Sequence, residues 1–198
     1  FVDVVERGRG PLGVEAEIID LEPRDRMRYP HRLWAHVDSG LLLKAATLGF
    51  KQEVYDLYAF SQLQIGNHVD RSKLKPVYPV QPLSAEKPVT ASAALAAQWD
   101  AKTVPSGFRM IQQSQRTLSG RTQPVLHHLY SDGITTVSVF VEQVTATEAK
   151  GGAMRQGALS VYGWRDGNFR ITALGEVPPE TVELFAKAYR LIEKPAEK

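Results

Sequence analysis

The chain has 198 residues, of which 43% are hydrophobic and 9% aromatic, an ordinary composition for a globular protein with a core. Its 24 basic and 22 acidic side chains leave a net charge of +2, too weak to indicate nucleic acid or an anionic membrane as a partner. The absence of cysteine excludes disulfides, thiolate nucleophiles and cysteine-ligated metal sites. No apolar run approaches the roughly 20 residues of a membrane-spanning helix.

The first 68 residues show strand patterns throughout. Phe1–Val5 already reads as a strand in progress, so we expect the N-terminus to be a cut end. Apolar residues then recur at nearly every second position, over residues 16–21, 29–37, 41–48 and 51–65. Short strands with short connections predict an antiparallel meander.

The stretch HRLWAHVDSGLLLK, residues 31–44, predicts the most apolar hairpin of this meander. A three-residue loop, Asp38–Gly40, with a positive φ at Gly40, would pair Val37 with Leu41 and Ala35 with Leu43. One face of the hairpin would then carry Leu33, Ala35, Val37, Leu41 and Leu43, while Trp34, Arg32, His36, Leu42 and Lys44 would face the other way. The apolar face is either core or a surface that meets lipid.

Residues 69–98 differ from the segments on either side. Four prolines stand at short intervals, and residues 71–98 carry four basic side chains against one acidic. Such a composition favours extended backbone over a sheet. We therefore predict an interdomain linker over 69–98, with a short helical turn at Ala91–Ala97.

The last hundred residues mix strand and helix patterns. Two pairs of β-rich runs surround the Asp-Gly turns at 132–133 and 166–167, which predicts two hairpins with a mobile loop, residues 148–157, between them. Pro178 and Pro179 then mark the start of a helix whose apolar residues follow a helical spacing. The fold class is therefore α+β, with antiparallel strands over 1–68 and a small sheet plus one helix over 99–198.

No motif indicates an active site. GRGPLG, residues 8–13, matches the letters of a dinucleotide-binding loop, but a strand follows it rather than a helix, so we predict a turn. His127 and His128 are adjacent on a strand and point to opposite faces, and turn chemistry explains the Ser-Asp-Gly that follows. We expect all five histidines at the surface or a sheet edge, and no catalytic, cofactor-binding or metal-binding residue.

Several segments together resemble the MucB/RseB family in order and spacing. They are PRDRMRYPHRLWAHVDSGLLLK (23–44), VYDLYAFSQLQIG (54–66), VPSGFRMIQQSQRTL (104–118), HHLYSDGITTVSVFVE (127–142) and GEVPPETVELFAKA (175–188). The family comprises periplasmic negative regulators of envelope-stress sigma factors of the sigma-E type. The resemblance covers most of the chain outside the linker and residues 145–157.

The resemblance implies a fold for each half. Residues 1–68 would be the last strands of a half-open β-barrel similar to the lipoprotein carriers LolA and LolB, without the upstream strands and helices that close the barrel. Residues 99–198 would be the small C-terminal α+β domain of the family. A partial sheet that exposes its apolar face is expected to aggregate, to dimerise or to pack against the neighbouring domain.

The resemblance also implies a function. Family members hold the periplasmic segment of a membrane anti-sigma factor of the MucA or RseA type and keep a site-one protease from cutting it, until lipopolysaccharide or lipoprotein acyl chains cause release. The partner would be protein rather than nucleic acid, and the chain would neither span the membrane nor act as an enzyme. We predict partner contacts at exposed aromatics and glycine turns: Trp34, Tyr130, Ser131, Asp132, Gly133 and Trp164.

Two alternatives stay open. A periplasmic lipid or lipoprotein carrier without a regulatory partner would share the strands of 1–68 but would have no use for the second domain. An unrecognised hydrolase would show a pH-dependent activity that depends on His127, His128 or Asp132.

Overall fold

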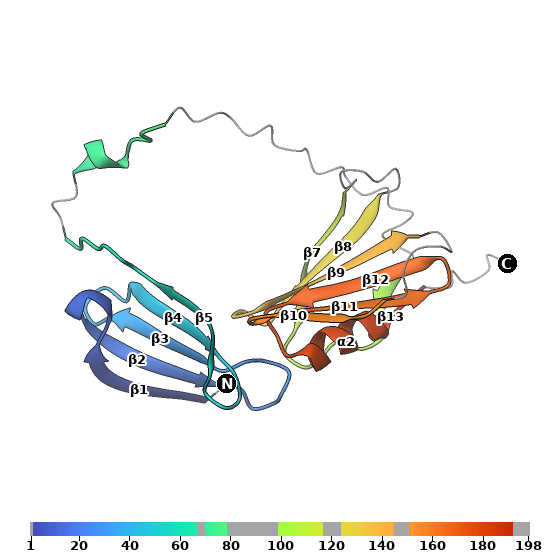
Figure 1. Ribbon diagram of the computed structural model, residues 1–198, viewed down its shortest axis with the longest axis horizontal. Helices are drawn as coiled ribbons and strands as arrows, with labels where there is room; N and C mark the ends of the chain where they lie inside the picture. Colours follow the sequence, from blue (N-terminus) through green and yellow to red (C-terminus); the bar gives the residue numbers. More distant parts are fainter. Residues whose placement is uncertain (1, 67–69, 79–98, 117–123, 145–150, 192–198) are drawn as a thin grey trace.

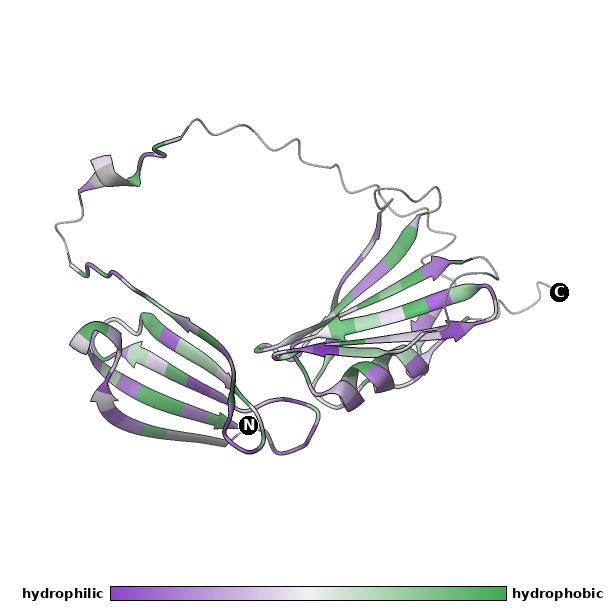
Figure 2. Cartoon of the chain, viewed as in Figure 1, coloured by the Kyte–Doolittle hydropathy of each residue, from purple (hydrophilic) through white to green (hydrophobic). Residues whose placement is uncertain are grey.

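The computed structural model describes residues 2–66, 70–78, 99–116, 124–144 and 151–191, and these form a five-stranded sheet, a six-stranded sheet and a two-stranded ribbon (Figure 1). Hydrophobic and hydrophilic residues alternate along the strands of both sheets, the period expected where the two faces of a strand meet different surroundings (Figure 2). The predicted α+β class with antiparallel strands is confirmed.

The first 60 residues form a five-stranded antiparallel sheet in the order β1-β2-β3-β4-β5, here called the N-terminal sheet. Its strands are β1 (Val2–Arg9), β2 (Glu15–Glu22), β3 (His31–His36), β4 (Leu42–Leu48) and β5 (Val54–Ala59). Each strand pairs with the next along the chain, so the predicted meander is confirmed. The GRGPLG segment is a turn between β1 and β2, as predicted, with a short 3₁₀ helix over Pro11–Gly13.

The predicted pairing within the β3–β4 hairpin is wrong. Gly40 has the expected positive φ of 67°, but the backbone N–H of His36 donates to the carbonyl of Leu41, which closes a four-residue turn rather than a three-residue one. The structure consequently pairs Ala35 with Leu42 and Trp34 with Lys44, and Leu43 falls at the resulting shift of register. The extra turn residue moves the pairing only between the turn and Ala35, and the bulge at Leu43 restores the predicted register from Trp34–Lys44 onward.

The second half of the chain forms the C-terminal unit, defined here as β6 to β13 together with α2. Its main sheet has the strand order β10-β11-β12-β9-β8-β7. The strands are β6 (Trp99–Ala101), β7 (Arg109–Arg116), β8 (Val125–Ser131), β9 (Thr136–Gln143), β10 (Ala153–Gln156), β11 (Leu159–Asp166), β12 (Phe169–Gly175) and β13 (Tyr189–Leu191). β6 and β13 pair with each other in a separate two-stranded ribbon.

Both predicted hairpins and the predicted helix are present in this unit. β8 and β9 meet around Asp132-Gly133, and β11 and β12 meet around Gly167-Asn168. The expectation of a loop over 148–157 is wrong for its second half, because Ala153–Gln156 pairs with β11 as the edge strand β10. The free edge of β11 offers backbone N–H and C=O groups, and hydrogen bonds to these groups order even a polar segment flanked by glycine.

One helix covers one face of this sheet. α2 (Pro179–Ala188) begins at the second of two consecutive prolines and packs against β11 and β12. Its buried side chains include Val182, Phe185 and Ala186, at the spacing that the sequence predicts. Together with strand residues they form the core, which comprises Trp99, Phe108, Leu126, Tyr130, Val137, Val139, Val141, Ile171, Ala173, Val177, Val182, Phe185, Ala186 and Tyr189.

The N-terminal sheet is much less buried. Ala16, Leu43 and Ala46 are buried, but Val5 and Tyr58 are each 55% exposed. Among the described residues, the helical segments within this sheet and directly after it along the chain are the short 3₁₀ turns Pro11–Gly13 and Arg71–Leu74. The second of these turns lies in the predicted linker, and the helical turn expected at 91–97 falls outside the described residues.

Candidate functional site

The connection between β2 and β3 contacts the C-terminal unit (Figure 1). It contains Asp25, Met27 and Arg28. The Thr181 hydroxyl, at the start of α2, donates to the carbonyl oxygen of Met27 at 2.9 Å, and Thr181 is fully buried. This loop is therefore a built contact between two parts of the chain more than 150 residues apart.

The centre of the contact is the Arg28 cluster, defined as Arg28 with Asp25, Ser106, Phe108 and Asp132. The guanidinium donates from Nε to the carboxylate of Asp132, from Nη1 to Asp25 Oδ2 at 2.6 Å, and from Nη2 to the carbonyl oxygen of Ser106 at 2.5 Å. Its Cζ lies 4.5 Å from the centre of the Phe108 ring, a cation–π distance. The side chains of Arg28 and Asp132 are only 7% and 4% exposed. Burial of charge is costly, and the hydrogen bonds of the guanidinium to Asp132, Asp25 and Ser106 offset that cost.

Local backbone structure positions the groups that receive Arg28. Asp132 Oδ1 accepts hydrogen bonds from the backbone N–H groups of Ile134 and Thr135, both at 2.9 Å, which leaves Oδ2 for the guanidinium. Gly107 has φ +88°, and a Cβ there would lie 2.6 Å from Nη2 of Arg28. Glycine is therefore required at 107 both by the backbone conformation and by the approach of Arg28.

The carboxyl group of Asp132 is held in its charged form. Burial by itself would raise its pKa, but hydrogen bonds from the backbone of Thr135 and Ile134, and then from Arg28, outweigh burial and lower the pKa below its usual range. The cluster is thus a permanent ion pair at neutral pH. Its chemistry is that of a structural contact between two sheets, since nothing in it offers a nucleophile with a base.

A second contact lies beside the first and joins β5 to β10. Arg155 places its guanidinium carbon 4.2 Å from the ring centre of Tyr55 and 5.8 Å from that of Tyr29. The two tyrosines pack edge to face at 5.1 Å. The position of Gly157 is also close to the carbonyl oxygen of Tyr55, to which an added Cβ would lie at 3.2 Å. The C-terminal end of β10, a segment that the sequence predicts as a loop, therefore contacts the edge strand β5 of the N-terminal sheet.

The structure distributes the predicted partner-contact residues over different environments. Tyr130 is only 1% exposed, with its hydroxyl 2.8 Å from that of Tyr189, so its predicted exposure is wrong: it lies on the core face of β8. Asp132 pairs with Arg28 inside the chain. Ser131 is half-buried and its hydroxyl donates to the carbonyl of Thr135, while Gly133 is exposed.

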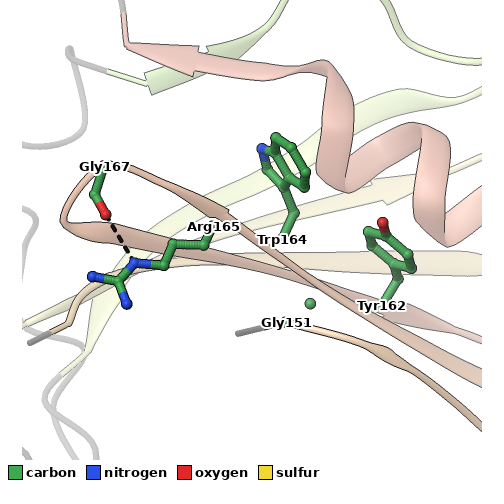
Figure 3. Close-up of a pocket in the computed structure, with 6 residues that line it drawn as sticks. Gly151, Tyr162, Trp164, Arg165 and Gly167 are labelled. Carbon is green, nitrogen blue, oxygen red and sulfur yellow. Dashed lines mark hydrogen bonds between the residues drawn. The ribbon is translucent and has the colours of Figure 1, made fainter. Parts of the chain in front are cut away.

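The two tryptophans predicted to contact a partner are half-buried. Trp34 lies under Lys44, whose Nζ is 4.2 Å from the ring centre. Trp164 borders a shallow hollow of about 480 Å³ with Gly151, Tyr162, Gly163, Arg165 and Gly167 (Figure 3). Figure 3 shows Trp164 and Tyr162 directed toward α2, whereas Arg165 extends along the hairpin and donates to the carbonyl of Gly167 at 2.9 Å.

The residues of the predicted apolar face differ in burial. Leu43 is fully buried, Leu41 is 39% exposed, and Leu33, Ala35 and Val37 are half-buried. The face thus offers both packed and accessible apolar surface, and its lipid-facing role stays a prediction.

The expectation that all five histidines lie at the surface or an edge is wrong for His128. This side chain is 1% exposed, because it shares the core face of β8 with Leu126 and Tyr130 at period two. His127 points the other way, stacks on Phe140 at 4.3 Å and lies 3.0 Å from the hydroxyl of Ser138. Over the described part of the chain, no group of three His, Asp or Glu side chains is arranged to hold a metal, and no helix is long and apolar enough to cross a membrane.

Sequence reasoning missed Arg28, the residue with the most partners in the contact. An arginine in the polar run RDRMR carries no local sign of burial, and its main partner stands 104 residues later. The sequence offered one signal, Asp132. In an Asp-Gly turn one carboxylate oxygen accepts hydrogen bonds from the turn backbone, and the second oxygen is left for a partner elsewhere in the chain.

Comparison with known proteins assigns the two halves of the chain. The model for the MucB/RseB N-terminal domain matches residues 3–78, and the model for the MucB/RseB C-terminal domain matches residues 93–190. The sigma factor AlgU regulatory protein MucB of Pseudomonas aeruginosa is 28% identical over 182 residues, which are 90% of this chain and 57% of that protein. The sigma-E factor regulatory protein RseB of Salmonella typhimurium is 28% identical over 199 residues, covering 96% of this chain and 59% of its own length.

Solved structures give the same result for the fold. The complex of Pseudomonas aeruginosa MucA and MucB matches with a TM-score of 0.80 at 24% identity, over 97% of this chain and 66% of that chain. MucB crystallised in complex with MucA(peri) matches at 0.78, and MucB alone at 0.64, both at 24% identity and over 97% and 96% of this chain and 68% and 62% of those chains. The chain spans about three fifths of the length of the curated relatives that it matches. It belongs to the MucB/RseB family.

Proposed function

We propose that this chain is a periplasmic regulatory binding protein. It would hold the periplasmic segment of an anti-sigma factor of the MucA or RseA type, shield that segment from site-one proteolysis and so restrain an envelope-stress sigma factor. The observation that carries the proposal is the match of one chain to both domains of the MucB/RseB family, in order. The curated relatives are named as regulatory proteins of AlgU and sigma-E, and two similar structures are complexes of MucB with MucA.

Binding alone accounts for the proposed regulation. A segment laid against a folded surface is excluded from a protease cleft, because the protease needs several residues of extended, accessible backbone. The regulator therefore needs no catalytic group of its own, and we infer that it is not an enzyme. The contacts predicted at Trp34, Trp164, Ser131 and Gly133 remain candidates for this surface, whereas Tyr130 and Asp132 would act by shaping it from within.

Release requires a second state with a lower affinity for the segment. A ligand can shift the balance only if it binds the two states with different affinities. The Arg28 cluster and the Arg155–Tyr55 contact hold the N-terminal sheet against the C-terminal unit. We propose that the relative position of these two parts is the element with two states, and that lipopolysaccharide or lipoprotein acyl chains favour the state with low affinity.

A proteolysis assay tests this function. The periplasmic segment of the cognate anti-sigma factor is incubated with its site-one protease, with and without this chain in excess. The proposal predicts that the chain slows cleavage of the segment and leaves cleavage of an unrelated peptide substrate unchanged. Equal cleavage rates with and without the chain would contradict it.

The alternative function is that of a lipid or lipoprotein carrier. It is favoured by the exposed apolar side chains of the N-terminal sheet, among them Val54, Leu57 and Tyr58 on the edge strand β5. A carrier would transfer a fluorescent acyl lipid between vesicles and would not protect the anti-sigma segment. A regulator would do the reverse, so the two assays together separate the two functions. The same apolar surface favours self-association, which sedimentation would measure.

A further inference from the structure

The proposed regulation leaves one feature of the C-terminal unit without a role: a chain of hydrogen-bonding side chains in its core. Nδ1 of His128 lies 2.8 Å from the hydroxyl of Tyr189, and this hydroxyl lies 2.8 Å from that of Tyr130. All three residues are 1% exposed or less. Each of these groups depends on the others for a hydrogen bond, since water has no access.

The hydrogen-bonded chain connects the main sheet to the β6–β13 ribbon. His128 and Tyr130 belong to β8, and Tyr189 is the first residue of β13. β13 pairs with β6, so that Tyr189 faces Ala101 and Leu191 faces Trp99. Trp99 is 2% exposed and packs on Phe169 at 5.0 Å. The ribbon is therefore attached to the main sheet by the hydrogen bonds of Tyr189 and by the apolar packing of Trp99.

The surroundings of His128 suit a neutral ring. Its Nε2 is buried and has no hydrogen-bond partner among the described residues. A neutral ring with its hydrogen on Nδ1 donates to the Tyr189 hydroxyl and has no N–H on Nε2. Protonation would add a buried charge and, on Nε2, an N–H without an acceptor. Burial accordingly lowers the pKa of His128, with a smaller opposing effect from Asp100.

The described ionisable groups that act on this ring are Tyr130 on β8, Tyr189 on β13 and Asp100 on β6, together with the adjacent His127, whose side chain lies on the opposite face of β8. The strand partners of His128 are Gln113 on β7 and Val139 on β9, neither of which carries charge. The carboxylate of Asp100 accepts a hydrogen bond from the backbone N–H of Ala101, and Asp100 is exposed, so it does not neutralise a buried imidazolium.

We propose that His128 makes the ribbon acid-labile: proton uptake by its imidazole places an uncompensated charge, and on Nε2 an N–H without an acceptor, in the core beside Tyr189, and this releases β6 and β13 from the core of the C-terminal unit. The strand β6 begins at Trp99, the first described residue after the long connection from the N-terminal sheet. Acid would thus free the point at which this connection enters the C-terminal unit, while the main sheet stays folded. This inference is independent of the partner and of the proposed function.

Hydrogen exchange of the whole chain between pH 7.5 and 5.0 tests the proposal, after correction for the intrinsic pH dependence of exchange. A group that binds a proton only in the open state changes the opening equilibrium by about tenfold per pH unit below its ordinary pKa near 6.5. We expect the protection of amides in residues 99–101 and 189–191 to fall at this rate below pH 6.5. Amides of β9 and β12 should keep their protection.

Two variants separate His128 from its surroundings. In His128→Asn the side-chain amide keeps a polar group near the position of Nδ1 but does not titrate. The protection of the ribbon amides in this variant should therefore be the same at pH 7.5 and at pH 5.0. In His127→Asn the wild-type behaviour should persist, because His127 faces away from the core. An equal pH response in wild type and His128→Asn would overturn the proposal, as would a loss of protection over the whole unit at once.

The wild-type chain provides the test even if His128→Asn does not fold. The imidazole resonances of His128 should titrate below the ordinary histidine pKa, and only at the pH where the ribbon amides have lost their protection. Titration of His128 near its ordinary pKa with an unchanged ribbon would overturn the proposal.

Discussion

Replacement of Arg28 by methionine should weaken the whole chain more than the loss of an ordinary surface charge. Arg28→Met keeps much of the aliphatic part of the side chain but removes the guanidinium, which donates hydrogen bonds to Asp132, Asp25 and the carbonyl oxygen of Ser106. The Asp132 carboxylate would then remain in a site where its side chain is 4% exposed, with only its two backbone hydrogen bonds.

The expected magnitude follows from this burial. Removal of one member of a buried ion pair costs about 3–5 kcal/mol, because the other charge is left unpaired. The backbone hydrogen bonds to Asp132 place this case near the lower value, about 3 kcal/mol. The pair Arg32–Asp20 is the matched control, since its side chains are 41% and 25% exposed. Arg32→Met should cost no more than about 1 kcal/mol.

Urea unfolding followed by circular dichroism measures both effects, and a double-mutant cycle isolates the pair. The cycle compares Arg28→Met, Asp132→Asn and the double variant. We expect a coupling free energy of about 1.5–3 kcal/mol, since the residues contact each other directly. Additivity within about 0.3 kcal/mol, or equal losses for Arg28→Met and Arg32→Met, would refute the reasoning.

Three further predictions concern the same contact and the edge strand beside it. Gly107→Ala and Gly133→Ala both place alanine at a positive φ, of 88° and 99°, but an added Cβ meets Arg28 only at 107, so the first should cost at least about 1 kcal/mol more in urea unfolding. Gly151→Ala places a Cβ on the carbonyl of Gly163, whereas Gly152→Ala meets open space, so hydrogen exchange over 153–156 should accelerate in the first variant alone. The lowered pKa of Asp132 adds stability that is complete above the ordinary aspartate pKa of 3.8 and is lost as pH falls below it, so the pH dependence of the urea midpoint below pH 4 should be smaller in Asp132→Asn.

The parts of the fold that sequence reasoning reached are those with local causes. Strand alternation, two Asp-Gly turns and a proline-led helical pattern act within a few residues, and the structure contains each of them. The register of the β3–β4 hairpin depends on a single extra turn residue, held by the hydrogen bond between His36 and Leu41. Composition carries no information about that choice.

The burial of the contact residues could not be predicted from local sequence patterns, because it depends on partners that are distant in the sequence. Arg28 is of a type that is rarely buried, and its burial follows from a carboxylate that the chain supplies from a distant hairpin. His128 was within reach, because Leu126 and Tyr130 flank it at period two on a strand with a buried face. An isolated polar residue in such a series indicates a core position with a buried partner, here Tyr189.

Calorimetric titration of this chain with the periplasmic segment of its cognate anti-sigma factor tests the central claim most directly, with Arg28→Met and Arg32→Met measured beside the wild type. The account predicts saturable binding at micromolar affinity or better for the wild type and Arg32→Met, and weaker binding for Arg28→Met, whose two sheets are no longer held together. Absence of binding by the wild-type chain would contradict the account, and equal affinities for all three proteins would show that the Arg28 cluster has no part in it.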